Sequence, residues 1–148
     1  MRIKETIPSK LEIVPDSIAK LIERLHDLPL DEDVIFSVKL CLQEAVVNAV
    51  KHGNKFNEKL KVQIVISVED GHLDLAVTDQ GTGFVPKEIP DPTTPENIAK
   101  LSGRGIFLIK KNMNKVRFAN GGRTIRMTKI LTKGRKSNWI SKPKKSTM

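Results

Sequence analysis

Residues 61–78, KVQIVISVEDGHLDLAVT, carry the pattern that decides the fold. Apolar and polar residues alternate from Lys61 to Val68 and again from His72 to Thr78, as in strands that bury one face. Between them, Glu69-Asp70-Gly71 is typical of a tight turn, because Asp and Gly tolerate the left-handed backbone that such turns need. The stretch therefore predicts an antiparallel β-hairpin.

A second hairpin and an N-terminal strand extend the predicted sheet. Lys115–Ala119 and Arg123–Leu131 are strand-like, and Asn120-Gly121-Gly122 separates them as a turn. Arg2–Ile7 is predicted to be a short strand that Pro8 closes.

Two helices are predicted between the first strand and the first hairpin. Apolar residues recur at spacings of three and four from Leu11 to Leu25, and Pro15 either begins this helix or bends it. The second helix is expected from about Glu32 to His52, with Asp31 as N-cap and Gly53 as C-terminal stop. Apolar residues surround most of its circumference, which predicts a central, buried helix.

A third helix is expected over Gly105–Met113, after a loop over Gly81–Ser102 that contains four prolines. We expect residues 84–102 to act as a mobile lid, with a short helix near residues 95–100. Two helices ahead of two hairpins predict an α+β fold: a two-layer sandwich with a mostly antiparallel mixed β-sheet and helices packed on one face. We expect a domain over residues 1–131 and a flexible basic tail over residues 132–148.

The positive charge of the chain lies mostly in that tail. The net charge is +9, and the six basic residues after Leu131 are accompanied by no acid, so the remaining residues carry +3. The tail lacks interleaved aromatic residues, so direct nucleic-acid binding is disfavoured.

The composition also limits the compartment. No apolar run approaches 18 residues, and no apolar stretch follows the N-terminus, so neither a membrane span nor a secretion signal is expected. The single cysteine, Cys41, is interpreted as a core residue. We therefore expect a soluble, cytoplasmic protein.

Polar residues interrupt the apolar second helix at a regular spacing. Glu44, Asn48 and His52 follow one another at steps of four, which places them on one helical face. The stripe is either a solvated face or the wall of a ligand cleft, because buried polar groups need partners.

Three glycine-containing segments follow, and each alone is also compatible with an ordinary turn or helix entry. Asp79-Gln-Gly81-Thr-Gly83 ends an apolar strand, where a carboxylate can face a cleft. Gly103-Arg104-Gly105 opens a helix, whose free N–H groups suit phosphate. Gly122-Arg-Thr124 brings a hydroxyl to the start of the last strand.

In this order, the four segments resemble the motif set of the GHKL ATPases, a superfamily that includes DNA gyrase B, heat-shock chaperone ATPases and sensor histidine kinases. The short form with two opening helices and a brief lid is most similar to the anti-sigma factor serine/threonine kinases. The resemblance covers about residues 3–131 and implies ATP and Mg²⁺ as ligands.

The resemblance also implies residue roles. Asn48 would give an oxygen to Mg²⁺, Glu44 would be the general base for a serine hydroxyl, and Asp79 would accept the adenine amino group. The remaining expected nucleotide-binding residues are His52 at the motif edge, Gly81 and Gly83 beside the base, Gly103 and Gly105 at the lid and phosphates, and Thr124 near the adenine.

One position departs from the family pattern. Leu101 stands where such kinases often carry a basic residue, so either Lys100 or Arg104 would supply positive charge at the γ-phosphate. Asn54 is interpreted as a helix-capping and lid-supporting residue.

The implied partners are a sigma factor and an anti-sigma factor antagonist that is phosphorylated on serine. Relatives of this type are often homodimers, although no stripe in this sequence establishes one. Two other functions stay open: a nucleotide-dependent protein-binding module of the same fold without kinase activity, and a basic nucleic-acid-associated protein.

Overall fold

The computed structural model describes residues 1–82 and 104–131, apart from the side chain of Arg104. The expected lid over residues 84–102, the short helix near residues 95–100, Gly83, Gly103 and the tail over residues 132–148 lie outside the described residues.

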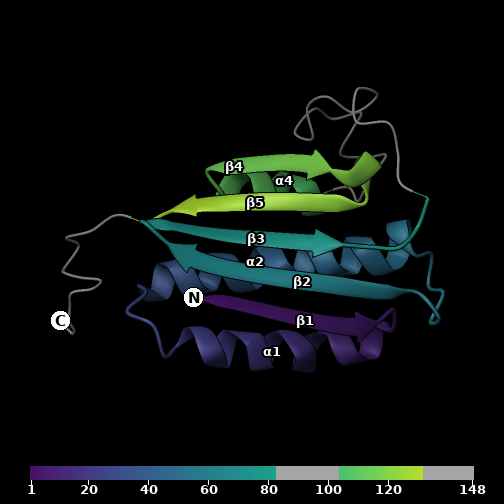
Figure 1. Cartoon of the computed structure of the whole chain (residues 1–148), viewed down its shortest axis with the longest axis horizontal. Coiled ribbons are helices and arrows are strands. Elements are labelled where there is room, and N and C mark those ends of the chain that lie inside the picture. Colours follow the sequence, from purple (N-terminus) through teal and green to yellow (C-terminus); the bar gives the residue numbers. More distant parts are fainter. Residues whose placement is uncertain (83–103, 132–148) are drawn as a thin grey trace.

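The described residues form a two-layer α+β fold, as the sequence predicts (Figure 1). Five strands make one sheet in the order β1-β2-β3-β5-β4, and all four neighbouring pairs are antiparallel. The strands are β1 (Arg2–Pro8), β2 (Lys61–Glu69), β3 (His72–Thr78), β4 (Lys115–Ala119) and β5 (Thr124–Ile130).

Both predicted hairpins are confirmed. Asp70 and Gly71 join β2 to β3 with φ values of 50° and 77°, which is the pair of positive values that a two-residue type I′ turn requires. The turn between β4 and β5 is η4 (Asn120–Gly122), where all three residues have positive φ.

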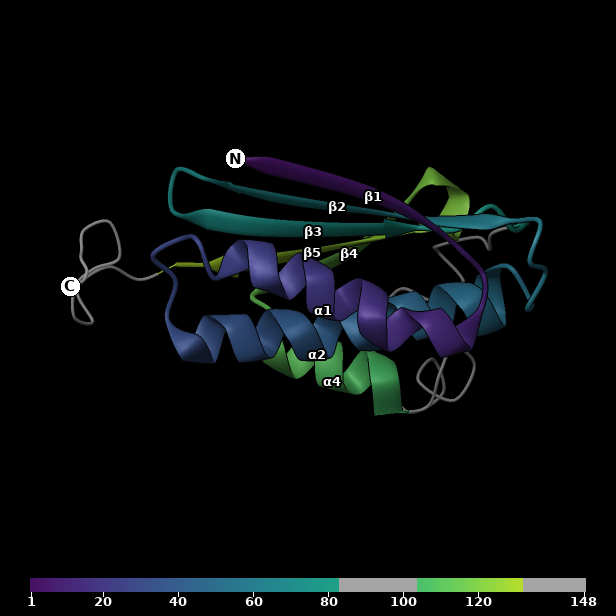
Figure 2. The ribbon, with the colours of Figure 1, turned by 90° about the horizontal axis from the view of Figure 1, so that it is seen from below.

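Within the described ranges, three α-helices cover one face of the sheet (Figure 2). They are α1 (Val14–Leu25), α2 (Glu32–Asn48) and α4 (Arg104–Asn112). Pro15 lies in the first turn of α1, directly after the 3₁₀ turn η1 (Leu11–Ile13), so it begins the helix and does not bend it. Within the described ranges, no helix is both long and apolar enough to cross a membrane.

The second helix differs from its prediction in two respects. It is α-helical only to Asn48 and continues as a π-helical turn, η2 (Ala49–Gly53). It is also not buried all round: Phe36 is 66% exposed, because the side of α2 that faces away from the sheet meets solvent. Asp31 stands at the N-cap position as predicted, but its side chain makes no capping hydrogen bond.

The core lies between the helices and the inner face of the sheet. Cys41 is fully buried there, as predicted, with its Sγ 4.0 Å from the carbonyl oxygen of Ile109 in α4. Burial raises the pKa of the Cys41 thiol to about 12, with a smaller opposing effect of Lys129. A thiol with this pKa stays protonated and acts as a small apolar side chain.

The two faces of α2 should respond differently to truncation. Leu42 is fully buried, so Leu42→Ala should lower the free energy of unfolding by about 2–5 kcal/mol, through lost burial and a cavity. Phe36→Ala on the exposed face should stay within about 0.5 kcal/mol of wild type. Urea unfolding measures both changes, and equal losses would contradict the described packing of α2.

Candidate functional site

Glu44 and Asn48 lie at the C-terminal end of α2, and both are half-buried. The π-helical turn η2 follows, so the α-helical stripe expected from Glu44 through His52 ends at Asn48. The His52 side chain is mostly exposed, and the partial desolvation of its ring, together with the Lys51 charge, lowers its pKa.

Asn48 carries an unsatisfied polar atom. Its Nδ2 is buried and has no hydrogen-bond partner among the described residues. An unpaired buried amide is destabilising by about 1–3 kcal/mol, so native proteins rarely contain one without a ligand or water. The Asn48 carboxamide is therefore the strongest indication on α2 of a ligand-binding site.

The N-terminus of α4 faces the same region. Ser37 Oγ donates to Asn112 Oδ1 at 3.4 Å, and one turn further along α2 Cys41 Sγ approaches the Ile109 carbonyl. The two helices thus run antiparallel, side by side (Figure 2). Glu44 and Asn48 lie one and two turns further along the same face of α2, in the direction of the N-terminus of α4.

Gly105 is buried in the first turn of this nine-residue helix. A helix N-terminus presents unpaired backbone N–H groups and the positive end of the helix dipole. The region between Asn48 and the start of α4 can therefore accept an anion such as a phosphate group.

Asp79 lies at the opposite end of the site, directly after β3. Its Oδ1 accepts a hydrogen bond from the Gly81 N–H at 2.8 Å, and its own N–H donates to the Arg123 carbonyl at 2.9 Å. Partial burial raises the pKa of the Asp79 carboxyl group, and the Gly81 hydrogen bond and the Arg123 charge oppose this rise. The result is a partly desolvated acceptor.

Two positions beside Asp79 require glycine, because neighbouring chain segments approach them too closely for a Cβ atom. A Cβ on Gly53 would overlap the Asp79 carboxyl group, and a Cβ on Gly81 would overlap the Gly53 carbonyl oxygen. Neither residue is among those with positive φ. The helical stretch ends at Gly53 as predicted, and the absence of a Cβ there also lets η2 contact the segment after β3.

Thr124 is buried at the start of β5, and the hydrogen bonds of its hydroxyl group go to residues other than Asp79. Its Oγ1 pairs with Thr78 Oγ1 at 2.8 Å and accepts from Asn120 Nδ2 at 2.7 Å. The residue opposite Asp79 across the strands is Arg123, which sequence reasoning missed because the turn sequence drew attention to the threonine. A place for Thr124 beside a bound base stays a prediction.

Asn54 is the second residue that sequence reasoning undervalued. It is 2% exposed, and its Oδ1 accepts from the backbone N–H of Gln80, the neighbour of Asp79, at 2.8 Å. The structure thus brings Gly53, Asp79 and Gly81 into direct contact, whereas Glu44 and Asn48 lie on the face of α2 that runs along α4. The roles of Gly83, Gly103 and the Arg104 side chain fall outside the described residues.

The raised pKa of Asp79 predicts an effect on stability. Above that pKa the unfolded chain holds the ionised carboxylate more favourably than the folded protein does, so the charge destabilises the fold. Asp79→Asn keeps the Oδ1 acceptor for Gly81 and removes the charge. We expect a higher melting temperature of the ligand-free variant at pH 7, and a difference that shrinks as the pH falls through the Asp79 pKa.

Asp27→Asn, at an exposed position, is the matched control and should leave the melting temperature unchanged. Scanning calorimetry at several pH values measures both variants. A lower melting temperature for Asp79→Asn at pH 7 would show that the carboxylate stabilises the free protein.

Comparison with known proteins places this geometry in a family. The family model of the histidine kinase-like ATPase domain matches residues 7–129. A serine-protein kinase RsbW of Oceanobacillus iheyensis is 29% identical over 136 residues, which cover 87% of this chain and 86% of that protein.

Two further relatives are similar over most of their length. The serine-protein kinase RsbW of Bacillus licheniformis is 34% identical over 113 residues, covering 70% of this chain and 69% of the relative. The anti-sigma F factor of Bacillus subtilis is 32% identical over 126 residues, covering 80% and 83%. The family model matches most of this chain, and the fold agrees with it. This chain therefore belongs to the histidine kinase-like ATPase domain family.

Proposed function

We propose that this protein is a cytoplasmic, ATP-binding anti-sigma factor that sequesters a sigma factor and phosphorylates an antagonist protein on serine. The names of its relatives support this function. The observation that carries it is the buried, unpartnered Asn48 amide, which lies beside Glu44 and toward the N-terminus of α4. Its unpaired Nδ2 is a hydrogen-bond donor, so it needs a ligand that offers an acceptor, such as a phosphate oxygen.

The residues present fit Mg²⁺ and the ATP phosphates. A carboxamide offers one oxygen and one NH₂ group, so Asn48 can give an oxygen to Mg²⁺, which prefers hard oxygen ligands and retains several waters. A bound Mg²⁺ would neutralise charge on the phosphates. The N–H groups at the start of α4 would bind the phosphate oxygens.

The end of the site at Asp79 fits the adenine ring of ATP. The Asp79 carboxylate accepts hydrogen bonds only, which matches the amino group of adenine and opposes the carbonyl oxygen that guanine carries at the same position. Because the carboxylate is partly desolvated, a donor that reaches it gains a strong, charge-assisted hydrogen bond.

In the proposed reaction the serine hydroxyl oxygen of the antagonist attacks the γ-phosphorus. The bond from that phosphorus to the bridging oxygen breaks, and ADP leaves. Glu44 accepts the hydroxyl proton. Its position one helical turn before Asn48 supports this role, because a base there would lie near phosphates bound at Asn48.

Asn48→Ala tests the metal ligand. Removing the carboxamide should abolish most of the gain in ATP affinity that Mg²⁺ provides, while metal-free binding persists. Calorimetric titration with ATP, with and without Mg²⁺, measures the gain. Gln43→Ala, an exposed amide on the same helix, is the control and should behave as wild type. Equal Mg²⁺ dependence in Asn48→Ala and wild type would place the metal elsewhere.

Glu44→Gln tests the base. The variant keeps the shape of the side chain and loses its basicity, so it should bind Mg-ATP and the sigma factor as wild type does. Phosphate transfer to the antagonist should slow by about 10²- to 10⁴-fold in a single-turnover assay with labelled γ-phosphate. Transfer within about threefold of wild type would show that Glu44 is not the base.

One feature of the sequence favours a second function. Leu101 occupies the position where a basic residue is common in the kinases that this chain resembles. If the wild-type protein binds Mg-ATP and its sigma factor but transfers no phosphate to any antagonist, it is a nucleotide-dependent binding module of the same fold.

A further inference from the structure

Asn54 connects four segments of the chain through one buried side chain. Its Nδ2 donates to Ser9 Oγ at 2.7 Å and to the Lys61 carbonyl at 3.0 Å, while its Oδ1 accepts from the Gln80 N–H at 2.8 Å. Its backbone N–H donates to the Ala49 carbonyl at 2.7 Å and so closes η2. Asn54 therefore joins the end of the helical layer to the chain after β1, to the start of β2 and to the chain after β3.

The bond to Gln80 acts on the segment that holds Asp79. Gln80 directly follows Asp79, and its own Oε1 accepts from the Lys61 N–H at 2.6 Å. Gly53, the residue before Asn54, contacts the Asp79 carboxyl group, and Gly81 contacts the Gly53 carbonyl. Two consecutive residues, Gly53 and Asn54, thus fix the backbone on both sides of Asp79.

The contacts of the Asn54 side chain require an amide. The position needs one acceptor and two donors at the same time, in a site that is 2% exposed. A carboxylate at this position would lose both donors, and an alanine would leave the Gln80 N–H and the Lys61 carbonyl without this partner.

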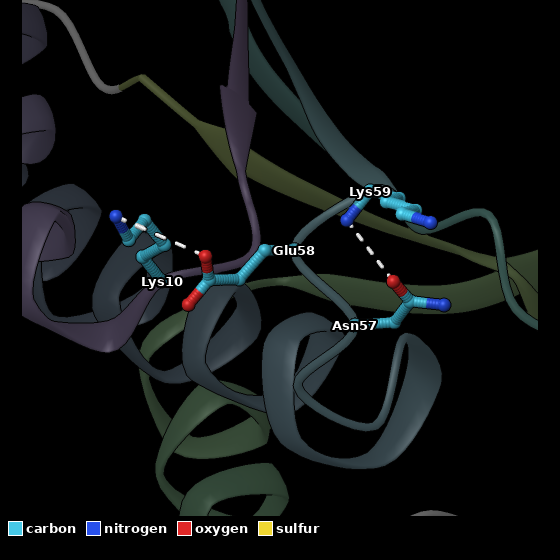
Figure 3. A network of polar contacts seen from close by, with 4 residues as sticks. All are labelled: Lys10, Asn57, Glu58 and Lys59. Atoms are coloured by element: carbon cyan, nitrogen blue, oxygen red, sulfur yellow. Dashed lines mark hydrogen bonds and ion pairs between the residues drawn. The ribbon is translucent and has the colours of Figure 1, made fainter.

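The loop after Asn54 has contacts of its own. The Asn57 N–H donates to the Asn54 carbonyl at 2.9 Å, and Asn57 Oδ1 accepts from the Lys59 N–H at 3.0 Å (Figure 3). Glu58 forms an ion pair with Lys10 at 3.9 Å in the same view. These contacts do not involve the Asn54 side chain. A substitution of that side chain should therefore affect the position of Asp79 while the contacts within the loop persist.

We propose that Asn54 is a positioning residue for base recognition: its amide holds Gln80, and thereby the Asp79 carboxylate, in the orientation that accepts the amino group of adenine. The inference rests on the proposed ATP-binding function. Asn54 touches no nucleotide in this proposal and acts only through Gln80 and Asp79. Its loss should therefore reduce base discrimination, an effect that a purely structural residue would not have.

The experiment compares ADP with inosine diphosphate, which carries a carbonyl oxygen in place of the adenine amino group. Titration calorimetry gives the ratio of the two affinities for wild type, Asn54→Ala, Asp79→Asn and Ser9→Ala. Wild type should prefer ADP by about tenfold or more, because the donor to a carboxylate is lost in the inosine compound. Asn54→Ala should lose most of this preference, so that its ratio moves toward one. Asp79→Asn is the reference without the carboxylate, and its amide NH₂ group can donate to the inosine carbonyl oxygen, so its ratio should fall at least as far.

Ser9→Ala is the matched control. Ser9 Oγ accepts from Asn54 Nδ2 and donates to the Leu60 carbonyl at 2.8 Å, so this variant also breaks the network, but on the side away from Gln80. Its melting temperature should fall, while its ADP preference should stay within twofold of wild type. Asn54→Ser, which leaves a smaller void than Asn54→Ala, is measured in parallel with the same expectation of lost preference, and it decides the test where Asn54→Ala does not fold.

An unchanged preference for ADP in the folded Asn54 variants would overturn the inference, as would an equal loss in Ser9→Ala. A wild-type protein that binds neither nucleotide would contradict the proposed function instead, so the two failures are distinguishable.

Discussion

The contact between Gly53 and the Asp79 carboxyl group is the constraint on which the candidate site depends. It joins the end of the α2–η2 helix to the segment after β3, and it exists only because neither Gly53 nor Gly81 carries a Cβ. Since α2 also carries Glu44 and Asn48, this contact sets the spacing between the two ends of the site. The proposed phosphate end is thereby fixed to one helix and the proposed adenine end to the C-terminal end of the central strand β3.

Each end of the site contains a polar group whose burial destabilises the ligand-free protein. The Asn48 Nδ2 is buried without a partner among the described residues, and Asp79 is partly desolvated. The Lys10–Glu58 ion pair and the contact of His26 Nε2 with Glu32, both within residues 1–82, lie elsewhere. A nucleotide would offer acceptors to the first group and a donor to the second. The well-packed core supplies the stability that offsets such functional groups.

Much of the fold could be predicted because its signals are local. Alternation identified β2 and β3, Asp70-Gly71 identified their turn, and the glycine pair after Asn120 identified the other hairpin. The exposed face of α2 could not be predicted from apolar content alone. Phe36 is apolar, yet it lies on the side of α2 that no layer formed by residues 1–82 and 104–131 covers, and periodicity does not reveal how many layers a fold has.

The candidate site was predictable in its residue types but not in its connections. Spacing singled out Asn48 and Asp79, whereas the roles of Asn54 and Arg123 depend on contacts across the fold. The π-helical turn was equally hidden, because one extra residue per turn leaves no mark in an apolar pattern. Gly53 ends the helical stretch as predicted, but its close contact with Asp79 could not be predicted, because that contact depends on how distant segments pack.

The central claim is that one nucleotide spans the distance between Asn48 and Asp79. Two-dimensional ¹⁵N NMR during titration with Mg-ADP tests it most directly, because backbone and side-chain amides report separately. We predict the largest shifts for the Asn48 side-chain amide and for the backbone amides of Gly53 and Gly81, with Val65 on the uncovered face of the sheet unchanged. Shifts confined to the uncovered sheet face, with Asn48 and Gly81 unmoved, would contradict the account.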